Sequence, residues 1–101
     1  MAQHAVIRID QGRAGEYRIQ IPDVATPARL TWIARTGPHG AVRVAEHTLV
    51  PPALEGRGLA RELVEALVAD ARALSFRIVP QCSYVAAQFA RHPDWADLRE
   101  G

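Results

Sequence analysis

The spacing of apolar residues changes within one stretch, Glu46 to Leu74, and this change constrains the fold more than any other feature. The segment EHTLVPP alternates as a strand does, and a turn with two glycines, EGRGLA, follows it. Apolar residues then recur with the period of an amphipathic helix, at Leu59, Ala60, Leu63, Val64, Leu67, Val68, Ala71 and Leu74. A helix that begins directly after a strand and a glycine turn presents unpaired backbone N–H groups, which suits it to binding phosphates.

Four alternating stretches precede this unit and predict four strands. They cover residues 4–10, 16–21, 28–35 and 41–50. Because the turns between them are short, an antiparallel meander is expected. The short apolar run from Phe76 to Val79 predicts a fifth strand after the long helix. A strand, a crossover helix and a strand form a right-handed parallel unit, so the fifth strand is expected to lie parallel to the fourth.

A second helix is predicted from Ser83 to Arg91, with Ser83 as its N-cap and Pro93 just beyond its end. The layout is four antiparallel strands, a long helix, a parallel fifth strand and a C-terminal helix. This order predicts an α+β fold built on one mixed sheet. At 101 residues the chain supports one core, so residues 1–101 are expected to form a single domain.

Composition excludes several classes of partner and location. The net charge is +1 and no cluster of basic residues occurs, so binding to nucleic acid is not expected. No apolar run reaches the roughly 20 residues that span a bilayer, and the N-terminus MAQHAVIRID lacks the features of a signal peptide. A cytoplasmic protein without a membrane partner is therefore expected. The single cysteine, Cys82, excludes an internal disulfide, and no sequence feature indicates an oligomeric state.

The glycine turn at residues 56–58 differs from two well-known phosphate-binding motifs. A P-loop would continue with Lys-Ser or Lys-Thr, where this chain has Leu59 and Ala60. A dinucleotide fingerprint would place a third glycine where Arg61 stands. Taken alone, these residues favour a plain glycine turn that leads into a core helix over a phosphate site.

Two longer segments are more specific when they are read with the order of the elements. They are HTLVPP…GRGLA…L at residues 47–63 and PQCSYV…FARHPDW.DL at residues 80–98. On these segments the chain resembles the GNAT N-acetyltransferase superfamily, in particular its small single-domain members. The resemblance implies transfer of an acetyl group from acetyl-CoA to a primary amine, carried by a small molecule or by a protein.

The resemblance also implies where coenzyme A binds. Backbone N–H groups of residues 57–60 are expected to hold the pyrophosphate, and the fourth and fifth strands are expected to separate and admit the pantetheine arm. The implied CoA-binding residues are Leu49, Val50, Gly56, Arg57, Gly58, Leu59, Ala60 and Arg61.

Three positions depart from the superfamily pattern. Ala53 stands where the phosphate motif usually opens with Gln or Arg, and Phe89 stands where a general-acid tyrosine is usual. The negative charge of Glu55 is favourable at the positive N-terminal end of the helix when no ligand is bound, but it would repel a phosphate. Arg57 and Arg61 lie one helical turn apart, and they either offset Glu55 or form a solvated surface.

Acyl transfer requires a base for the acceptor amine and an acid for the leaving thiolate. His47, on the strand expected to face the thioester, is either that base or a histidine hydrogen-bonded within the sheet. Strand alternation places Glu46 on the opposite face from His47. Tyr84 is either the acid, in place of the missing tyrosine, or a half-buried core aromatic. Cys82 ends the fifth strand near the expected thioester sulfur, where it is either a nucleophile or a small buried residue.

Three functions are compatible with these residues. The first is an N-acetyltransferase. The second is a module that binds CoA or acyl-CoA with little or no catalysis, which the departures at Ala53 and Phe89 favour. The third is an interaction domain that keeps the fold without the ligand. No set of residues has metal-ligand spacing, so no metal is expected.

Overall fold

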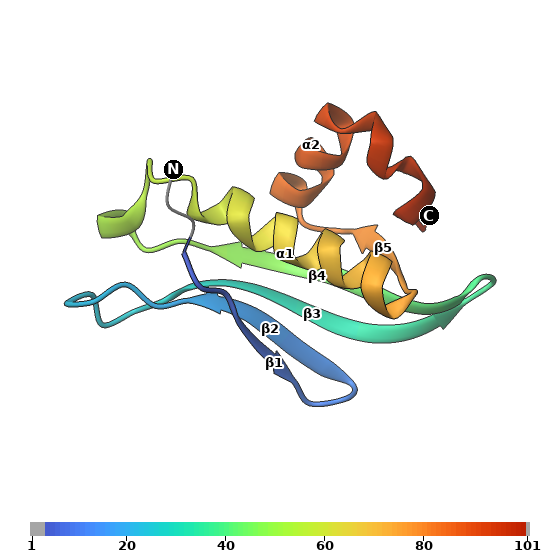
Figure 1. Cartoon of the computed structure of the whole chain (residues 1–101), viewed down its shortest axis with the longest axis horizontal. Coiled ribbons are helices and arrows are strands. Elements are labelled where there is room, and N and C mark those ends of the chain that lie inside the picture. Colours follow the sequence, from blue (N-terminus) through green and yellow to red (C-terminus); the bar gives the residue numbers. More distant parts are fainter. Residues whose placement is uncertain (1–3, 101) are drawn as a thin grey trace.

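Five strands form one mixed sheet in the computed structural model, which describes residues 4–100 (Figure 1). The strands are β1 (Ile7–Asp10), β2 (Ala14–Ile19), β3 (Ala28–Gly37), β4 (Gly40–Leu49) and β5 (Arg77–Pro80), and they lie side by side in that order. Strands β1 to β4 pair antiparallel, and β5 pairs parallel to β4. The predicted α+β fold is therefore confirmed, with small shifts in the bounds of the strands.

Among the described residues, two α-helices lie on one face of this sheet (Figure 1). They are α1 (Leu59–Leu74) and α2 (Ser83–Arg91), accompanied by the short 3-10 segments η1 (Pro52–Leu54) and η2 (Pro93–Leu98). The bounds of α2 agree with the prediction, but its N-cap is Cys82 and not Ser83. Cys82 has the extended backbone of a capping residue, with φ −66° and ψ 131°, whereas Ser83 already belongs to the helix.

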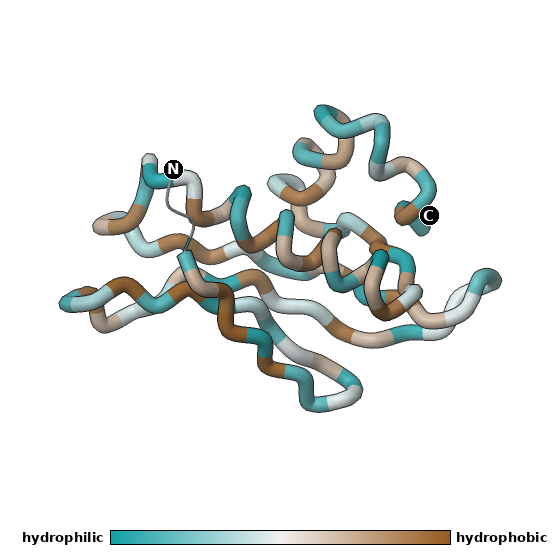
Figure 2. The backbone as a smooth tube through the Cα atoms, in the orientation of Figure 1, coloured by the Kyte–Doolittle hydropathy of each residue, from teal (hydrophilic) through white to brown (hydrophobic). Residues whose placement is uncertain are grey.

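The main core lies between α1 and the sheet. Leu63 and Leu67 of α1 are fully buried against Leu30 of β3 and the rest of one contiguous cluster. Apolar residues recur along the elements that meet there (Figure 2). The predicted apolar stripe of α1 is buried as far as Ala71, which is 1% exposed, except at Ala60, which is half-buried. Leu74, in the last turn of the helix, is 62% exposed, so the stripe is shorter than the sequence suggests.

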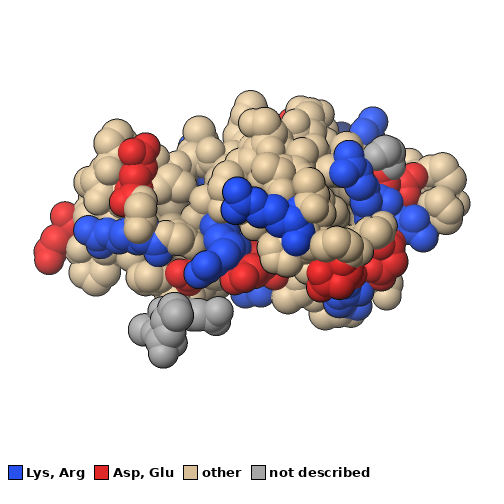
Figure 3. All heavy atoms as spheres, turned by 90° about the horizontal axis from the view of Figure 1, so that it is seen from above, with Lys and Arg blue, Asp and Glu red and all other residues tan. Residues whose placement is uncertain are grey.

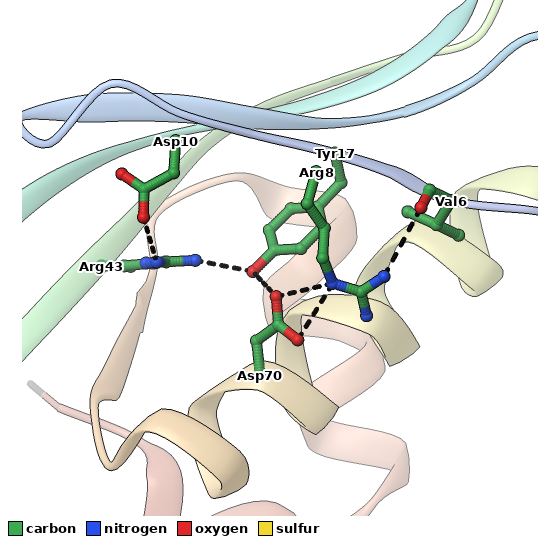
Figure 4. Close-up of polar contacts among 6 residues, drawn as sticks. All are labelled: Val6, Arg8, Asp10, Tyr17, Arg43 and Asp70. Carbon is green, nitrogen blue, oxygen red and sulfur yellow. Dashed lines mark hydrogen bonds and ion pairs between the residues drawn. The ribbon is translucent and has the colours of Figure 1, made fainter.

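A chain of polar contacts joins β1, β2 and β4 to α1 beside this core (Figure 4). The Tyr17 hydroxyl, which is shielded from solvent, donates to Oδ2 of Asp70 at 2.9 Å and accepts from Nη1 of Arg43 at 2.8 Å. Nε of Arg8 donates to both carboxylate oxygens of Asp70, at 3.0 and 2.9 Å. Burial raises the pKa of Tyr17 far above its ordinary value, so its hydroxyl stays a donor at any physiological pH.

Replacement of Asp70 by alanine is expected to lower the free energy of unfolding by about 1–3 kcal/mol, because the buried Tyr17 hydroxyl loses its acceptor. Denaturant unfolding measures this change. Asp97→Ala is the matched control, since Asp97 pairs with Arg72 in an exposed position and such pairs contribute little. Equal stability of the two variants would show that the contacts in Figure 4 do not hold β2 to α1.

The opposite face of the sheet, termed the open face here, carries no helix in the described part of the chain (Figure 1). Because Arg8 pairs with Tyr17 and turns toward α1, its neighbours Ile7 and Ile9 point to the open face. The first strand was expected to be half-buried from His4 onward, but β1 begins at Ile7, which is 47% exposed. Buried residues of the open face, such as Val44, lie outside the main core cluster.

Charged side chains of both signs are interspersed on the surface seen in Figure 3. This mixture agrees with the small net charge of +1. None of the described helices combines the length and the apolar character that crossing a membrane requires.

Candidate functional site

The first turn of α1 presents backbone N–H groups that have no helical partner. Gly56 (φ +81°) and Gly58 (φ +75°) adopt the left-handed conformation, which glycine reaches without steric cost and which turns the chain into the helix. Gly58 is the N-cap, and its carbonyl accepts from the N–H of Glu62 at 3.2 Å. The N–H groups of residues 59–61 therefore have no intrahelical acceptor, and no side chain caps them.

The space in front of this helix end is open. Nothing lies within 4 Å of the position a Cβ would take at Gly56. At Gly58 the nearest group is the guanidinium of Arg61, whose Nη2 lies 3.4 Å from that position. Nε of Arg61 is 3.9 Å from the Glu65 carboxylate, a long pair on an exposed surface. Arg61 thus holds its charge beside the positive end of α1, where a bound anion would be attracted by both.

Strands β4 and β5 are paired over only part of their length. The last pair joins Ala45 to Pro80, whereas β4 continues to Leu49. Pro80 has no N–H to donate, so the ladder ends there. Beyond Ala45 the edge of β4 that faces β5 has no strand partner among residues 4–100. Leu49 is 45% exposed and Val50 is half-buried beside this gap.

Cys82 lies where the gap begins. Its N–H donates to the carbonyl of Ala45 at 2.9 Å, and its Sγ is 3.4 Å from Oγ1 of Thr48. Burial raises the pKa of the thiol, but the Thr48 hydroxyl and the N–H groups of Val85 and Tyr84 lower it by more. The pKa of Cys82 therefore lies below its ordinary value, which favours the thiolate, the nucleophilic form of cysteine.

Beside Cys82, β4 contains a β-bulge at Glu46. Thr31 of β3 pairs with His47, but the next residue, Trp32, pairs with Ala45, so Glu46 has no partner of its own. His47 shares the open face with its partner Thr31. Glu46 lines a hollow on that face together with Thr31. The prediction that Glu46 and His47 point to opposite faces is therefore wrong.

The imidazole of His47 is exposed and makes no hydrogen bond within the described part of the chain. The alternative interpretation, a histidine hydrogen-bonded within the sheet, is thus not what the structure shows. The ring nitrogens of His47 are accessible to a substrate on the open face.

A family model described as GCN5-related N-acetyl-transferase matches residues 16–98 of the 101-residue chain. The chain belongs to the GCN5-related N-acetyltransferase family. The match runs from β2 to η2, so it includes the glycine turn, the gap and Cys82. Acetyl transfer is the type of reaction that this membership supports, and the resemblance seen in the sequence is confirmed.

The two aromatic residues of α2 differ in what they can do. Phe89 is 6% exposed and packs edge-to-face on Trp95, with ring centroids 5.4 Å apart, so it belongs to the core. Tyr84 is half-buried at the start of α2. Burial raises the pKa of Tyr84, while the charges of Arg61 and Arg91 act in the opposite direction. The raised pKa keeps Tyr84 protonated near neutral pH, which is the form that a general acid requires.

The remaining histidines have structural partners. Nδ1 of His92 lies 2.8 Å from the carbonyl of Gln88 at the end of α2, and its ring stacks on Trp95 at 3.9 Å between centroids. His4 lies 3.0 Å from the Glu62 carboxylate, and His39 lies 3.2 Å from Glu100. Within residues 4–100 no group of three or more His, Cys, Asp or Glu side chains is placed to hold a metal ion.

Sequence reasoning does not find two groups beside Cys82. They are the Thr48 hydroxyl and the Ala45 carbonyl. The bulge determines which residues of β4 point toward the helices. Nothing in the residues EHTL indicates that the strand has an extra residue there. Simple alternation can therefore not identify Thr48 as the partner of the thiol.

Proposed function

We propose that this chain transfers an acetyl group from acetyl-CoA to a primary amine. The proposal rests on one observation, that three features lie on the consecutive elements from β4 to the start of α2. These are the N–H groups at the start of α1, the gap where β4 extends beyond its pairing with β5, and the Cys82 thiol at that gap. Helix N-termini bind phosphates, and an unpaired strand edge binds an amide-containing arm by ladder hydrogen bonds.

In the proposed complex the pyrophosphate lies at the start of α1, with Arg61 beside it. The pantetheine arm follows the free edge of β4 past Leu49 and Val50. Its thioester then lies close to Cys82. Helices α1 and α2 contact each other, and the charge of Arg61 acts on Tyr84.

The chemistry requires two proton transfers. The amine nitrogen attacks the thioester carbon, the C–N bond forms, and the C–S bond breaks to release the CoA thiolate. His47 takes the proton that the amine loses, and Tyr84 supplies a proton to the leaving thiolate. The acceptor is either a small molecule or a protein-borne amine.

A second candidate function is CoA or acyl-CoA binding with little catalysis. Phe89 favours it, because this buried ring occupies the position of the usual tyrosine and has no proton to give. Thiol release from acetyl-CoA with a panel of primary amines distinguishes the two. Binding without release supports the module, and amine-dependent release supports the transferase.

CoA binding is tested first at Gly58. CoA at 100 times its dissociation constant is expected to raise the free energy of unfolding of the wild-type chain by about 2.7 kcal/mol. Gly58→Glu is expected to abolish that rise, because its side chain and its charge enter the phosphate site. Thermal unfolding with and without CoA measures both.

Gly40→Glu is the matched control. Gly40 also has a positive φ, +107°, with nothing within 4 Å of its Cβ position, so the backbone strain and the added charge are comparable. This variant should keep the CoA-induced rise. An equal rise in both variants would place the phosphate site elsewhere, and no rise in the wild type would leave the interaction domain as the remaining hypothesis.

A further inference from the structure

A hollow of about 340 Å³ lies on the open face at the bulge of β4. Its lining includes Glu46 from the bulge, Thr31 from β3, Glu16 and Arg18 from β2, and Ile9 from β1. The charged residues that line it are two carboxylates and one guanidinium, which gives a net charge of −1. Arg18 and Arg29 both pair with Glu16, so the unpaired charge of the hollow is the Glu46 carboxylate, which attracts a cation.

The two carboxylates of the hollow are not equivalent. Glu16 accepts from Arg18 at 2.7 Å and from Arg29 at 3.4 Å, so internal partners satisfy its charge. Glu46 is half-buried and makes no ion pair or hydrogen bond with any described residue. A bound cation with N–H donors stabilises a partly buried, unpaired carboxylate more than a carboxylate that already has partners.

Thr31 adds an unsatisfied polar atom to the same hollow. Its Oγ1 is buried and has no hydrogen-bond partner in the described structure. Because this atom has almost no accessible surface, it lies within the wall of the hollow and does not itself contact a ligand. Thr31 is also the strand partner of His47, so the orphan hydroxyl lies beside the predicted base.

We propose that this hollow binds the protonated acceptor amine, with the Glu46 carboxylate as its anionic partner and Ile9 beside its aliphatic arm. Glu46 is then a binding residue, and His47, next to it on the same face, takes the proton that the ammonium must lose before its nitrogen can attack. The second proton, released when the C–N bond forms, passes to solvent, and Tyr84 protonates the CoA thiolate. The location fits, because Glu46 follows Ala45, the residue whose carbonyl holds Cys82 at the gap. The role of the amine as acetyl acceptor rests on the proposed function, whereas its binding in the hollow does not.

Backbone amide NMR spectra of the wild-type chain, titrated with n-butylamine and separately with n-butanol at pH 7, test the inference. The two probes have the same length, but only the amine is charged. We expect saturable shifts at the residues that line the hollow with butylamine and not with butanol. Equal shifts with both probes, or shifts confined to other surfaces, would overturn the inference. This comparison needs no variant, no CoA and no turnover.

A variant then assigns the anionic partner. Glu46→Gln should weaken butylamine binding by about fivefold or more, as the loss of an ion pair predicts. In the transfer assay it should raise KM for the amine by a similar factor and leave KM for acetyl-CoA unchanged. Asp94→Asn removes an equal charge on the exposed surface of η2 and should change neither quantity. Unchanged butylamine affinity in Glu46→Gln would rule out Glu46 as the partner, even in a chain that binds CoA.

Discussion

Replacement of His47 by glutamine is expected to lower turnover by roughly 10²-fold or more, with little change in CoA affinity. Glutamine keeps the size and polarity of the side chain but cannot accept the amine proton. The bulge of β4 brings His47 to the open face beside Thr31, and its imidazole is exposed and makes no hydrogen bond within residues 4–100. Steady-state rates of CoA thiol release, measured with saturating amine, give the size of the effect.

The pH profile separates a base from a merely structural residue. Wild-type turnover should rise with pH, because a base must be unprotonated to accept the amine proton, and the His47→Gln variant should lack that rise. His39→Gln is the control, since His39 is an exposed histidine paired with Glu100 at the turn between β3 and β4. A His47→Gln variant that folds and keeps both the rate and the rise would leave His47 without a catalytic role.

The fold was predictable because the period of burial is visible in the sequence. Tyr17 and Ile19 alternate with polar residues and are buried against α1, as expected for a strand with one covered face. Residues that recur at helical spacing in α1, such as Leu63 and Leu67, are buried in the same core. The parallel pairing of β5 with β4 followed from the rule for a strand, a crossover helix and a strand.

The faces of the strands were less predictable, because they depend on pairing with other elements. An extra residue at Glu46 changes which side chains of β4 face the helices, and the cause lies in the register with β3, not in the residue itself. The alternation of Ile7 and Ile9 correctly indicated a strand. It could not indicate that their face would be the one without helices.

The candidate site also contains features that were predictable from the sequence and features that were not. The free N–H groups at the start of α1 were predictable, since Gly56 and Gly58 signal both the turn and the helix end. The contact between Cys82 and Thr48 depends on a long-range arrangement of β4 and α2, and only the thiol could be proposed from the sequence. The hollow at Glu46 requires four strands and has no local sequence signal.

The last prediction concerns Cys82. If transfer passes through the thiol instead of directly from acetyl-CoA to the amine, incubation with acetyl-CoA should transfer one acetyl group to Sγ, with the CoA sulfur leaving as thiol and a protein thioester forming. Two observations favour this. The pKa of the thiol is lowered by Thr48 and by the N–H groups at the start of α2, after burial has acted in the opposite direction. The thiol also lies where the gap between β4 and β5 begins, beside the proposed path of the pantetheine arm.

Intact mass spectrometry can assign this acetyl group with little ambiguity, because the chain has no lysine, its 12 Lys and Arg residues all being arginine, and Cys82 is the single cysteine. Hydroxylamine removes an acetyl group from a thioester but not from an N-terminal amide. Cys82→Ala should therefore lose the hydroxylamine-sensitive acetyl group and, if transfer passes through the thiol, lose turnover on the order of 10²-fold or more. A hydroxylamine-sensitive acetyl group that persists in Cys82→Ala, or full turnover in that variant, would exclude the covalent route.

A second experiment tests only whether Cys82 lies beside the pantetheine arm. If it does, saturating CoA should slow alkylation of Cys82. A thiol that reacts equally fast with and without CoA does not lie beside the pantetheine arm.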